Sequence, residues 1–227
     1  MNLHPQLIID TSYLAAAFLF IYGLKRMSSP VTARSGIVVA GVGMLVATLA
    51  SFLYFFGVDD AARPHLTSNL ALAAIALGLG TGLSWWQGKR VPVTAMPQMV
   101  ALYNGMGGGA AAAIAAVELL RATDHALVPL VVTVIGALIG SISLSGSLIA
   151  WAKHDGKIDK TWRKRGQQAL NGAFFFATLA LGFYIVFFAQ GHADPRVVAA
   201  FFVGALIFGV LMTMPIGGAD MPVVISL

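Results

Sequence analysis

The stretch LVPLVVTVIGALIGSISLSGSLIAWA, from Leu127 to Ala152, contains no charged residue and is long enough to cross a bilayer as one helix. A helix is expected because irregular backbone facing lipid would leave its polar groups without partners. Six further apolar runs of similar length are separated by turn and breaker residues. The seven predicted spans are Leu7–Leu24, Gly36–Gly57, Leu66–Trp86, Ala95–Leu120, Leu127–Ala152, Gln168–Ala189 and Val197–Ile216. The sequence therefore predicts an all-α, polytopic membrane bundle that forms a single transmembrane domain over residues 1–227.

The overall composition indicates the same class of protein. Of the 227 residues, 58% are hydrophobic and 10% are charged, and the mean hydropathy is +0.83. Soluble domains are about half apolar and about a quarter charged, so a soluble enzyme, a disordered tail and a fibrous repeat are excluded. The chain has no cysteine. A disulfide framework, a thiolate nucleophile and a cysteine-based metal site are therefore excluded as well.

The basic residues predict how the chain crosses the membrane. The net charge is +5, and only three of the 14 lysines and arginines, Arg63, Arg121 and Arg196, lie in the even-numbered loops. All the others lie in the first, third and fifth loops. By the positive-inside rule these odd loops are cytoplasmic, which places the N-terminus outside and the C-terminus in the cytoplasm. The positive charge is thus explained by topology, and no nucleic-acid partner is expected.

The predicted spans contain almost no ionisable side chains. Glu118 lies near the outer end of the fourth span, and all five histidines lie in tails or loops. No His/Asp/Glu cluster has the spacing of a metal site, and no Ser–His–Asp arrangement is recognisable. No loop exceeds about 20 residues, which is too short for a dinucleotide-binding unit. We therefore expect no catalytic, metal-binding or cofactor-binding residue on this chain, and no tight binding of NAD or NADP by the chain alone.

In the fourth span the uncharged polar residue Asn104 lies about one turn from the centre, in the run YNGMGGGAAAA. Two interpretations stay open, because a buried amide can join helices or can lie on a path for water or protons. Four glycines, in the pairs Gly105–Gly109 and Gly136–Gly140, have the GxxxG spacing that lets helix backbones approach closely. In the fifth span, Ser143 and Ser147 fall on the same helical face as Gly136 and Gly140.

The chain ends IGGADMPVVISL, in which Gly217 and Gly218 end the seventh span and Asp220 follows. By the predicted topology this is a cytoplasmic turn, and VVISL has the character of the start of an eighth span. A span that stops so early cannot cross the bilayer. The sequence predicts that the chain is cut here or is completed by another polypeptide.

Four stretches together resemble one family, the beta subunit of proton-translocating NAD(P) transhydrogenase. They are GLKRMSSPVTARSGI (Gly23–Ile37), MPQMVALYNGMGGGAAAAIAAVELL (Met96–Leu120), IGSISLSGSLIAWAK (Ile139–Lys153) and MTMPIGGADMPVVISL (Met212–Leu227). The resemblance covers the whole chain. It implies the membrane part of that subunit, without the last two spans and the soluble NADP-binding domain.

The resemblance implies a function that the residues alone do not. The family couples hydride transfer between NADH and NADP+, in soluble domains that bind NAD(H) and NADP(H), to inward proton movement through the membrane part. It implies an alpha subunit, the NADP-binding domain of the beta subunit and a second protomer as partners, in the inner membrane of a bacterial cell. The alternatives are a transporter or channel subunit for another small solute, or a non-catalytic membrane scaffold, but no internal repeat and no central charge favours a transporter.

The resemblance also implies roles for three residues. Asn104 falls where many members have the histidine of the proton path. Because asparagine does not titrate, we expect a histidine from a helix of the alpha subunit here. Ser147 matches a serine that lines the same path, and Asp220 matches the acidic residue at the cytoplasmic mouth. A further asparagine of the path belongs to the eighth span, beyond Leu227.

Overall fold

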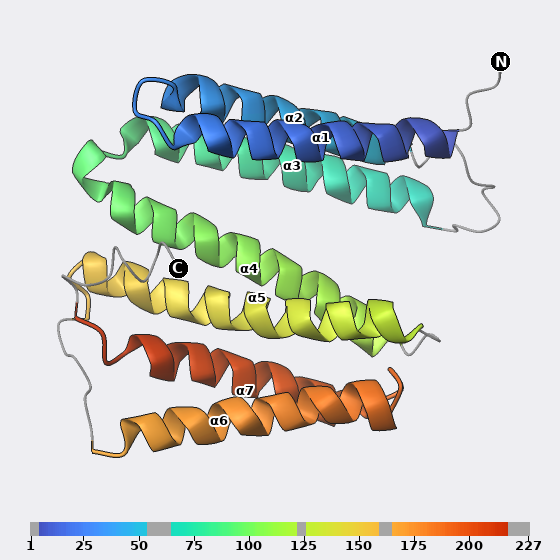
Figure 1. The fold of residues 1–227 in the computed structure, drawn as a ribbon, viewed down its shortest axis with the longest axis vertical. Coiled ribbons are helices and arrows are strands. Elements are labelled where there is room, and N and C mark those ends of the chain that lie inside the picture. Colours follow the sequence, from blue (N-terminus) through green and yellow to red (C-terminus); the bar gives the residue numbers. More distant parts are fainter. Residues whose placement is uncertain (1–4, 54–64, 122–125, 159–164, 218–227) are drawn as a thin grey trace. The chain divides into compact units, whose positions relative to one another are not determined.

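The computed structural model describes residues 5–53, 65–121, 126–158 and 165–217, and all of its regular structure is helical (Figure 1). The helices are α1 (Pro5–Met27), α2 (Ala33–Leu53), α3 (Leu66–Arg90), η3 (Val93–Ala95), α4 (Met96–Leu120), α5 (Leu127–His154), α6 (Gln167–Phe183), η4 (Tyr184–Phe188) and α7 (Pro195–Thr213). Within the described residues, seven helices are long and apolar enough to cross a membrane. The prediction of an all-α bundle with seven spans is confirmed, whereas the orientation of the termini stays a prediction.

Contacts between the helices separate the chain into two compact units, residues 1–88 and 89–227. In the first unit, α1 and α2 form an antiparallel pair whose buried residues recur every seven positions. These residues are Ile9, Ala16 and Gly23 on α1, and Gly36, Gly43 and Ala50 on α2. A seven-residue repeat keeps one seam facing the partner helix, and small residues on that seam let two backbones approach closely in lipid. The third helix of the unit, α3, has no buried residue.

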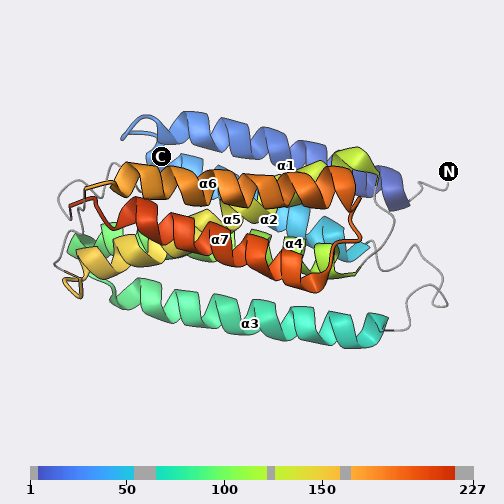
Figure 2. The ribbon, with the colours of Figure 1, turned by 90° about the horizontal axis from the view of Figure 1, so that it is seen from below.

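The second unit is built around α5. This helix packs against α4 on one side and against α7 on another, and α6 packs against α7 (Figures 1 and 2). The apolar core of the second unit consists of side chains from α4, α5, η4 and α7. Among them, Leu119, Ile185 and Phe201 are almost completely buried. Most other large side chains of the unit are exposed, as expected for helices whose outer faces meet lipid.

Two local features explain where the last helices end and begin. The α-helical bonding of α6 gives way at Tyr184 to a π-helical turn, which ends in the left-handed residues Gln190 and Gly191. Asp194 then caps α7, because its carboxylate accepts a hydrogen bond of 2.7 Å from the backbone N–H of Arg196. Pro195 occupies the first position of the helix, where its missing N–H costs nothing. The sequence predicted one continuous span from Gln168 to Ala189, and the change to π-helical bonding was not foreseen.

The contact that sets the spacing of α4 and α5 lies at Gly108 and Gly140. A Cβ added at Gly108 would lie 2.8 Å from the carbonyl oxygen of Gly140 and 2.8 Å from Cβ of Ser143. A Cβ added at Gly140 would lie 2.9 Å from the backbone nitrogen of Ala112. These neighbours are backbone atoms or the stem of a side chain, so they cannot move aside cheaply. The two helices touch backbone to backbone here.

This contact predicts that alanine substitutions at two neighbouring glycines change the stability differently. Gly108→Ala should lower the free energy of unfolding by about 1–3 kcal/mol, because the new methyl group forces α4 and α5 apart. Gly107→Ala, whose Cβ would meet no atom within 4 Å, is the matched control and should be neutral or stabilising. Thermal unfolding of the two detergent-solubilised variants measures the difference. Equal stability would show that Gly108 is not at a tight contact.

Candidate functional site

The hydrogen bond between Asn104 and Ser147 joins α4 to α5. The side-chain amide nitrogen of Asn104 donates to Oγ of Ser147 at 3.1 Å and to Oγ of Ser143 at 3.4 Å. Gly105 makes this approach possible, since a Cβ at that position would lie 2.8 Å from Cβ of Ser147. The structure thus brings together the two residues for which a place on the proton path was expected, and it adds Ser143 to them.

The two main residues of this site, Asn104 and Ser147, differ in exposure. Ser147 is buried between the helices, whereas Asn104 is exposed. Both hydrogen bonds use the amide nitrogen of Asn104, so its carbonyl oxygen is a further acceptor. The site therefore combines three uncharged polar groups that can donate and accept hydrogen bonds without titrating. Such groups can hold water but cannot release or take up a proton at ordinary pH.

The four serines of α5 have different surroundings. Ser143 and Ser147 face α4, as described above. Ser145, which is buried, lies next to Gly209 of α7 and donates to the carbonyl oxygen of Ser141 at 3.1 Å. Ser141 is 1% exposed, and its hydroxyl has no hydrogen-bond partner among the described residues. Ser145 therefore points to another helix than Ser143 and Ser147 do, because residues two positions apart in a helix are about 200° apart.

The glycines predicted to pack the helices occupy different environments. Gly105 lies against Ser147, and an added Cβ at Gly109 would lie 3.1 Å from a methyl group of Leu144. Gly140 lies against the backbone of Gly108, as shown above. A Cβ at Gly136 would meet no atom within 4 Å in the described part of the chain. The closest approach of α4 and α5 thus joins Gly140, a member of the predicted pair on α5, to Gly108, which belongs to neither predicted pair.

Charged groups are sparse near the site. The acidic residues within the seven described helices are Asp10 of α1 and Glu118 of α4. Within the described residues, no group of three or more His, Asp or Glu side chains is placed to hold a metal ion. Asp220, predicted to lie at the cytoplasmic mouth, falls outside the described residues. Its role stays a prediction.

Lys153 is a buried residue that the sequence patterns did not single out. It is 7% exposed and lies at the end of α5, where Nζ donates to the carbonyl oxygens of Thr213, the last residue of α7, and of two residues beyond it. The signal was present in the sequence, because Lys153 directly continues the apolar run that ends at Ala152. It was counted only as a loop charge. A lysine that is still inside a helix and next to an apolar span must bury its amine or extend it to the interface.

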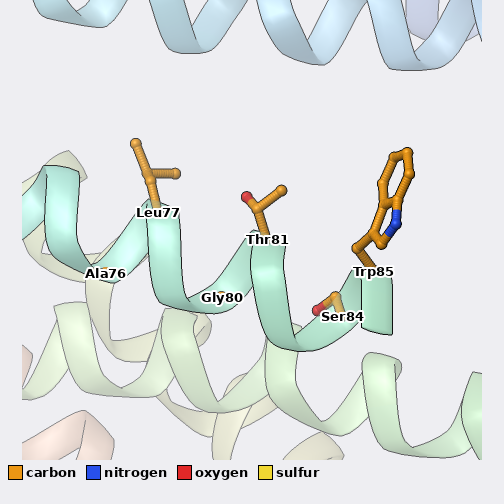
Figure 3. Close-up of a pocket in the computed structure, with 6 residues that line it drawn as sticks. All are labelled: Ala76, Leu77, Gly80, Thr81, Ser84 and Trp85. Carbon is orange, nitrogen blue, oxygen red and sulfur yellow. The ribbon is translucent and has the colours of Figure 1, made fainter. Parts of the chain in front are cut away.

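The helix α3 presents an open face and no enclosed site. Leu77, Thr81 and Trp85 project from the same side of this helix (Figure 3). A shallow pocket there is lined by Ala76, Leu77, Gly80, Thr81, Ser84 and Trp85. Because all of these residues belong to one helix and none of them titrates near neutral pH, the pocket carries no chemistry that can be assigned.

The fold and the site define a class: a polytopic helical membrane protein with an uncharged polar pair between two tightly packed helices. The sequence profile of the family described as NAD(P) transhydrogenase beta subunit matches residues 9–227. The chain is also similar to two relatives, both named NAD(P) transhydrogenase subunit beta and both from Rhodospirillum rubrum, at 32% identity over 224 residues. The alignment covers 95% of this chain and 46% of each relative.

The chain therefore belongs to the NAD(P) transhydrogenase beta subunit family, and it spans about half the length of the relatives that it matches. The resemblance seen in the four sequence stretches is confirmed by this match. The two residues expected on the proton path, Asn104 and Ser147, both lie within the matched region.

A double-mutant cycle tests whether the two side chains interact as the structure places them. Ser147→Ala and Asn104→Leu should each destabilise the detergent-solubilised protein, and their effects should be non-additive by about 0.6–2 kcal/mol, as for other hydrogen bonds between membrane helices. Ser143→Ala, which removes the more distant acceptor, should couple less strongly to Asn104→Leu. Strict additivity for Ser147→Ala would contradict the hydrogen bond.

Proposed function

We propose that this chain is the proton-translocating membrane part of an NAD(P) transhydrogenase. The observation that carries the proposal is the hydrogen bond between Asn104 and Ser147, two residues expected on the proton path, in a chain of the beta subunit family. Hydride transfer between NADH and NADP+ takes place in soluble domains that bind NAD(H) and NADP(H). This chain binds neither cofactor and supplies the path for inward proton movement.

The chemistry of the pair defines what it contributes. Asn104, Ser143 and Ser147 hold water by donating and accepting hydrogen bonds, and they do not titrate. The proton is then carried by water and by a titrating group from outside the described residues. The exposed side of Asn104 supports an approach by a partner helix, and we assign the titrating histidine to a helix of the alpha subunit.

Coupling follows from linkage between the two sites. If the redox state of NADP(H) opens the path to one side at a time, protonation in the path must change NADP(H) affinity by the same factor. Asp220 is the residue that we assign to the gate at the cytoplasmic mouth. Asn104 and Ser147 then set which waters the path holds in each state.

The proposed assembly has three protein partners and one lipid environment. They are the alpha subunit or subunits, the NADP-binding domain of the beta subunit and a second protomer, all in the inner membrane of a bacterial cell. The odd loops, rich in lysine and arginine, support an orientation with the N-terminus outside and the C-terminus in the cytoplasm. Membership of the family favours this function over the transporter, channel and scaffold alternatives.

Replacing Asn104 tests the path. Asn104→Leu should lower the rate of proton movement into membrane vesicles by at least about tenfold, because the apolar side chain cannot hold water. A tenfold lower rate corresponds to an activation free energy raised by about 1.4 kcal/mol. Met106→Leu, at an exposed position of the same helix, is the control and should pump normally. Unchanged pumping by Asn104→Leu would mean that Asn104 only packs α4 against α5.

Replacing Asp220 tests the gate. Asp220→Asn removes the charge and should uncouple pumping from hydride transfer in the complete complex, so that fewer protons cross per hydride transferred. Asp155→Asn is the matched control, because Asp155 is an exposed acid in a predicted cytoplasmic loop, 2.8 Å from Lys157. The ratio of vesicle acidification to NADP+ reduction measures the effect. Normal, fully coupled activity in Asp220→Asn would refute the assignment.

A further inference from the structure

Lys153 holds the backbone that leaves α7. Its Nζ donates to the carbonyl oxygens of Thr213 at 3.3 Å, of Ile216 at 2.7 Å and also of Met214. An ammonium group has three donors and no acceptor, so three carbonyl oxygens match its whole hydrogen-bonding capacity. The side chain is 7% exposed. All three N–H donors of this α5 lysine thus bond to a segment that lies about 60 residues further along the chain.

Lys153 supplies hydrogen-bond donors at the C-terminal end of α7. The last carbonyl groups of a helix lack partners within it and carry the negative end of the helix dipole. At the end of α7, the carbonyl oxygen of Val210 accepts from the backbone N–H of Met214 at 2.9 Å, and that of Leu211 accepts from the side-chain amide of Gln167 at 3.3 Å. Lys153 donates to the carbonyl oxygens of Thr213 and, beyond the helix, of Met214 and Ile216. A positive charge at this end is electrostatically favoured.

A second contact holds the same segment. Ile216 packs against a small apolar cluster formed by Ala101 of α4 with Ala150 and Trp151 of α5. In addition, the side-chain amide of Gln98 donates to the carbonyl oxygen of His154 at 3.3 Å, which ties the ends of α4 and α5 together. The segment from Met214 to Ile216 is therefore attached to the α4–α5 pair by a polar and an apolar contact.

This attachment lies next to the candidate site along both helices. Ala101 is one helical turn from Gly105, and Ala150 is one turn from Ser147. In the other direction, Ile216 is followed four residues later by Asp220. Non-covalent contacts thus attach the segment to the packed end of the α4–α5 pair, and four residues of chain lead from Ile216 to the residue assigned to the gate. Any change in the spacing of α4 and α5 at the site acts on the surface to which the segment is attached.

We propose that Lys153 is a positioning residue for coupling: it fixes the segment after α7 against the α4–α5 pair, so that the state of the Asn104–Ser147 site is passed to Asp220. This inference rests on the proposed function. Lys153 touches neither the transported proton nor a cofactor in this scheme. It acts through the backbone that it holds, and its removal separates the site from the gate.

The first experiment measures whether Lys153 holds the segment. The chain has no cysteine, so Met214→Cys introduces the one thiol into residues 1–227, and its reaction with a membrane-impermeant maleimide is followed by mass spectrometry in inside-out vesicles of the complete complex. Adding Lys153→Met should raise the labelling rate by at least about fivefold, the lower end of typical coupling factors. Lys153→Arg should keep labelling near the starting rate.

Lys157→Met is the matched control. Lys157 is close to Lys153 in sequence, but its side chain is 57% exposed, pairs with Asp155 and lies 4.0 Å from the ring centre of Trp151. Its removal takes the same charge from a nearby position without removing a hydrogen bond to the segment after α7. Labelling at position 214 should not change. An equal increase in both variants would show a general effect of charge and would overturn the proposal.

The second experiment measures coupling in the same complexes without the added cysteine. Lys153→Met should lower the number of protons moved per hydride by at least about fivefold, and Lys153→Arg should restore most of it. Increased labelling with normal coupling would overturn the proposal, since the contact would then be only structural. Unchanged labelling would overturn it directly. If Lys153→Met does not accumulate in the membrane, Ile216→Ala, which loosens the second contact, is judged by the same two criteria.

The outcomes separate this inference from the function on which it rests. Failure of the proposed function would appear as normal pumping in both Asn104→Leu and Asp220→Asn, whatever Lys153→Met does to labelling. Failure of the positioning role would appear as normal coupling in Lys153→Met while the other two variants are impaired. Slower pumping in Asn104→Leu, together with loss of coupling in Asp220→Asn and Lys153→Met and rescue by Lys153→Arg, is the result expected.

Discussion

The backbone contact between Gly108 and Gly140 sets the geometry on which the rest of the second unit depends. Helices in lipid gain little from the hydrophobic effect when they associate, so close packing and interhelical hydrogen bonds must hold them together. With no side chain at either position, α4 and α5 approach until backbone atoms touch. Only at this separation does the short side chain of Asn104 reach Ser147 across the interface. The polar site is a consequence of the glycine contact.

The helix α5 serves different neighbours with different residues. Toward α4 it presents Gly140 and two serine hydroxyls that accept from Asn104. Toward α7 it presents Ser145, which packs next to Gly209. At its end it presents Lys153, which is bonded to the backbone that leaves α7. One helix therefore connects the site, the neighbouring helix and the exit segment, which is why we place the coupling between path and gate on α5.

The ends of the helices show which boundaries can be predicted from the sequence and which cannot. The fifth span was predicted to start at Leu127 and does so, because an uncharged run this long has no other stable form in lipid. The seventh was predicted to continue to Ile216, but the helix ends at Thr213. Apolar character alone does not show that the carbonyl oxygens beyond Thr213 turn to Lys153. The π-helical turn that begins at Tyr184 was missed for a similar reason, since its apolar residues fit an α-helix equally well.

The sequence by itself determined the number of spans, the asymmetry of the basic loops, the family and the two polar residues of the site. These properties depend on composition and on short-range spacing, which a chain displays in any conformation. Only the tertiary structure decided that Gly108 makes the closest contact of α4 with α5, that Ser143 and Ser147 rather than Ser141 and Ser145 bond to Asn104, and that Lys153 is buried. Helical periodicity assigns residues to faces, but which helix meets each face, and at what height, depends on contacts between distant segments.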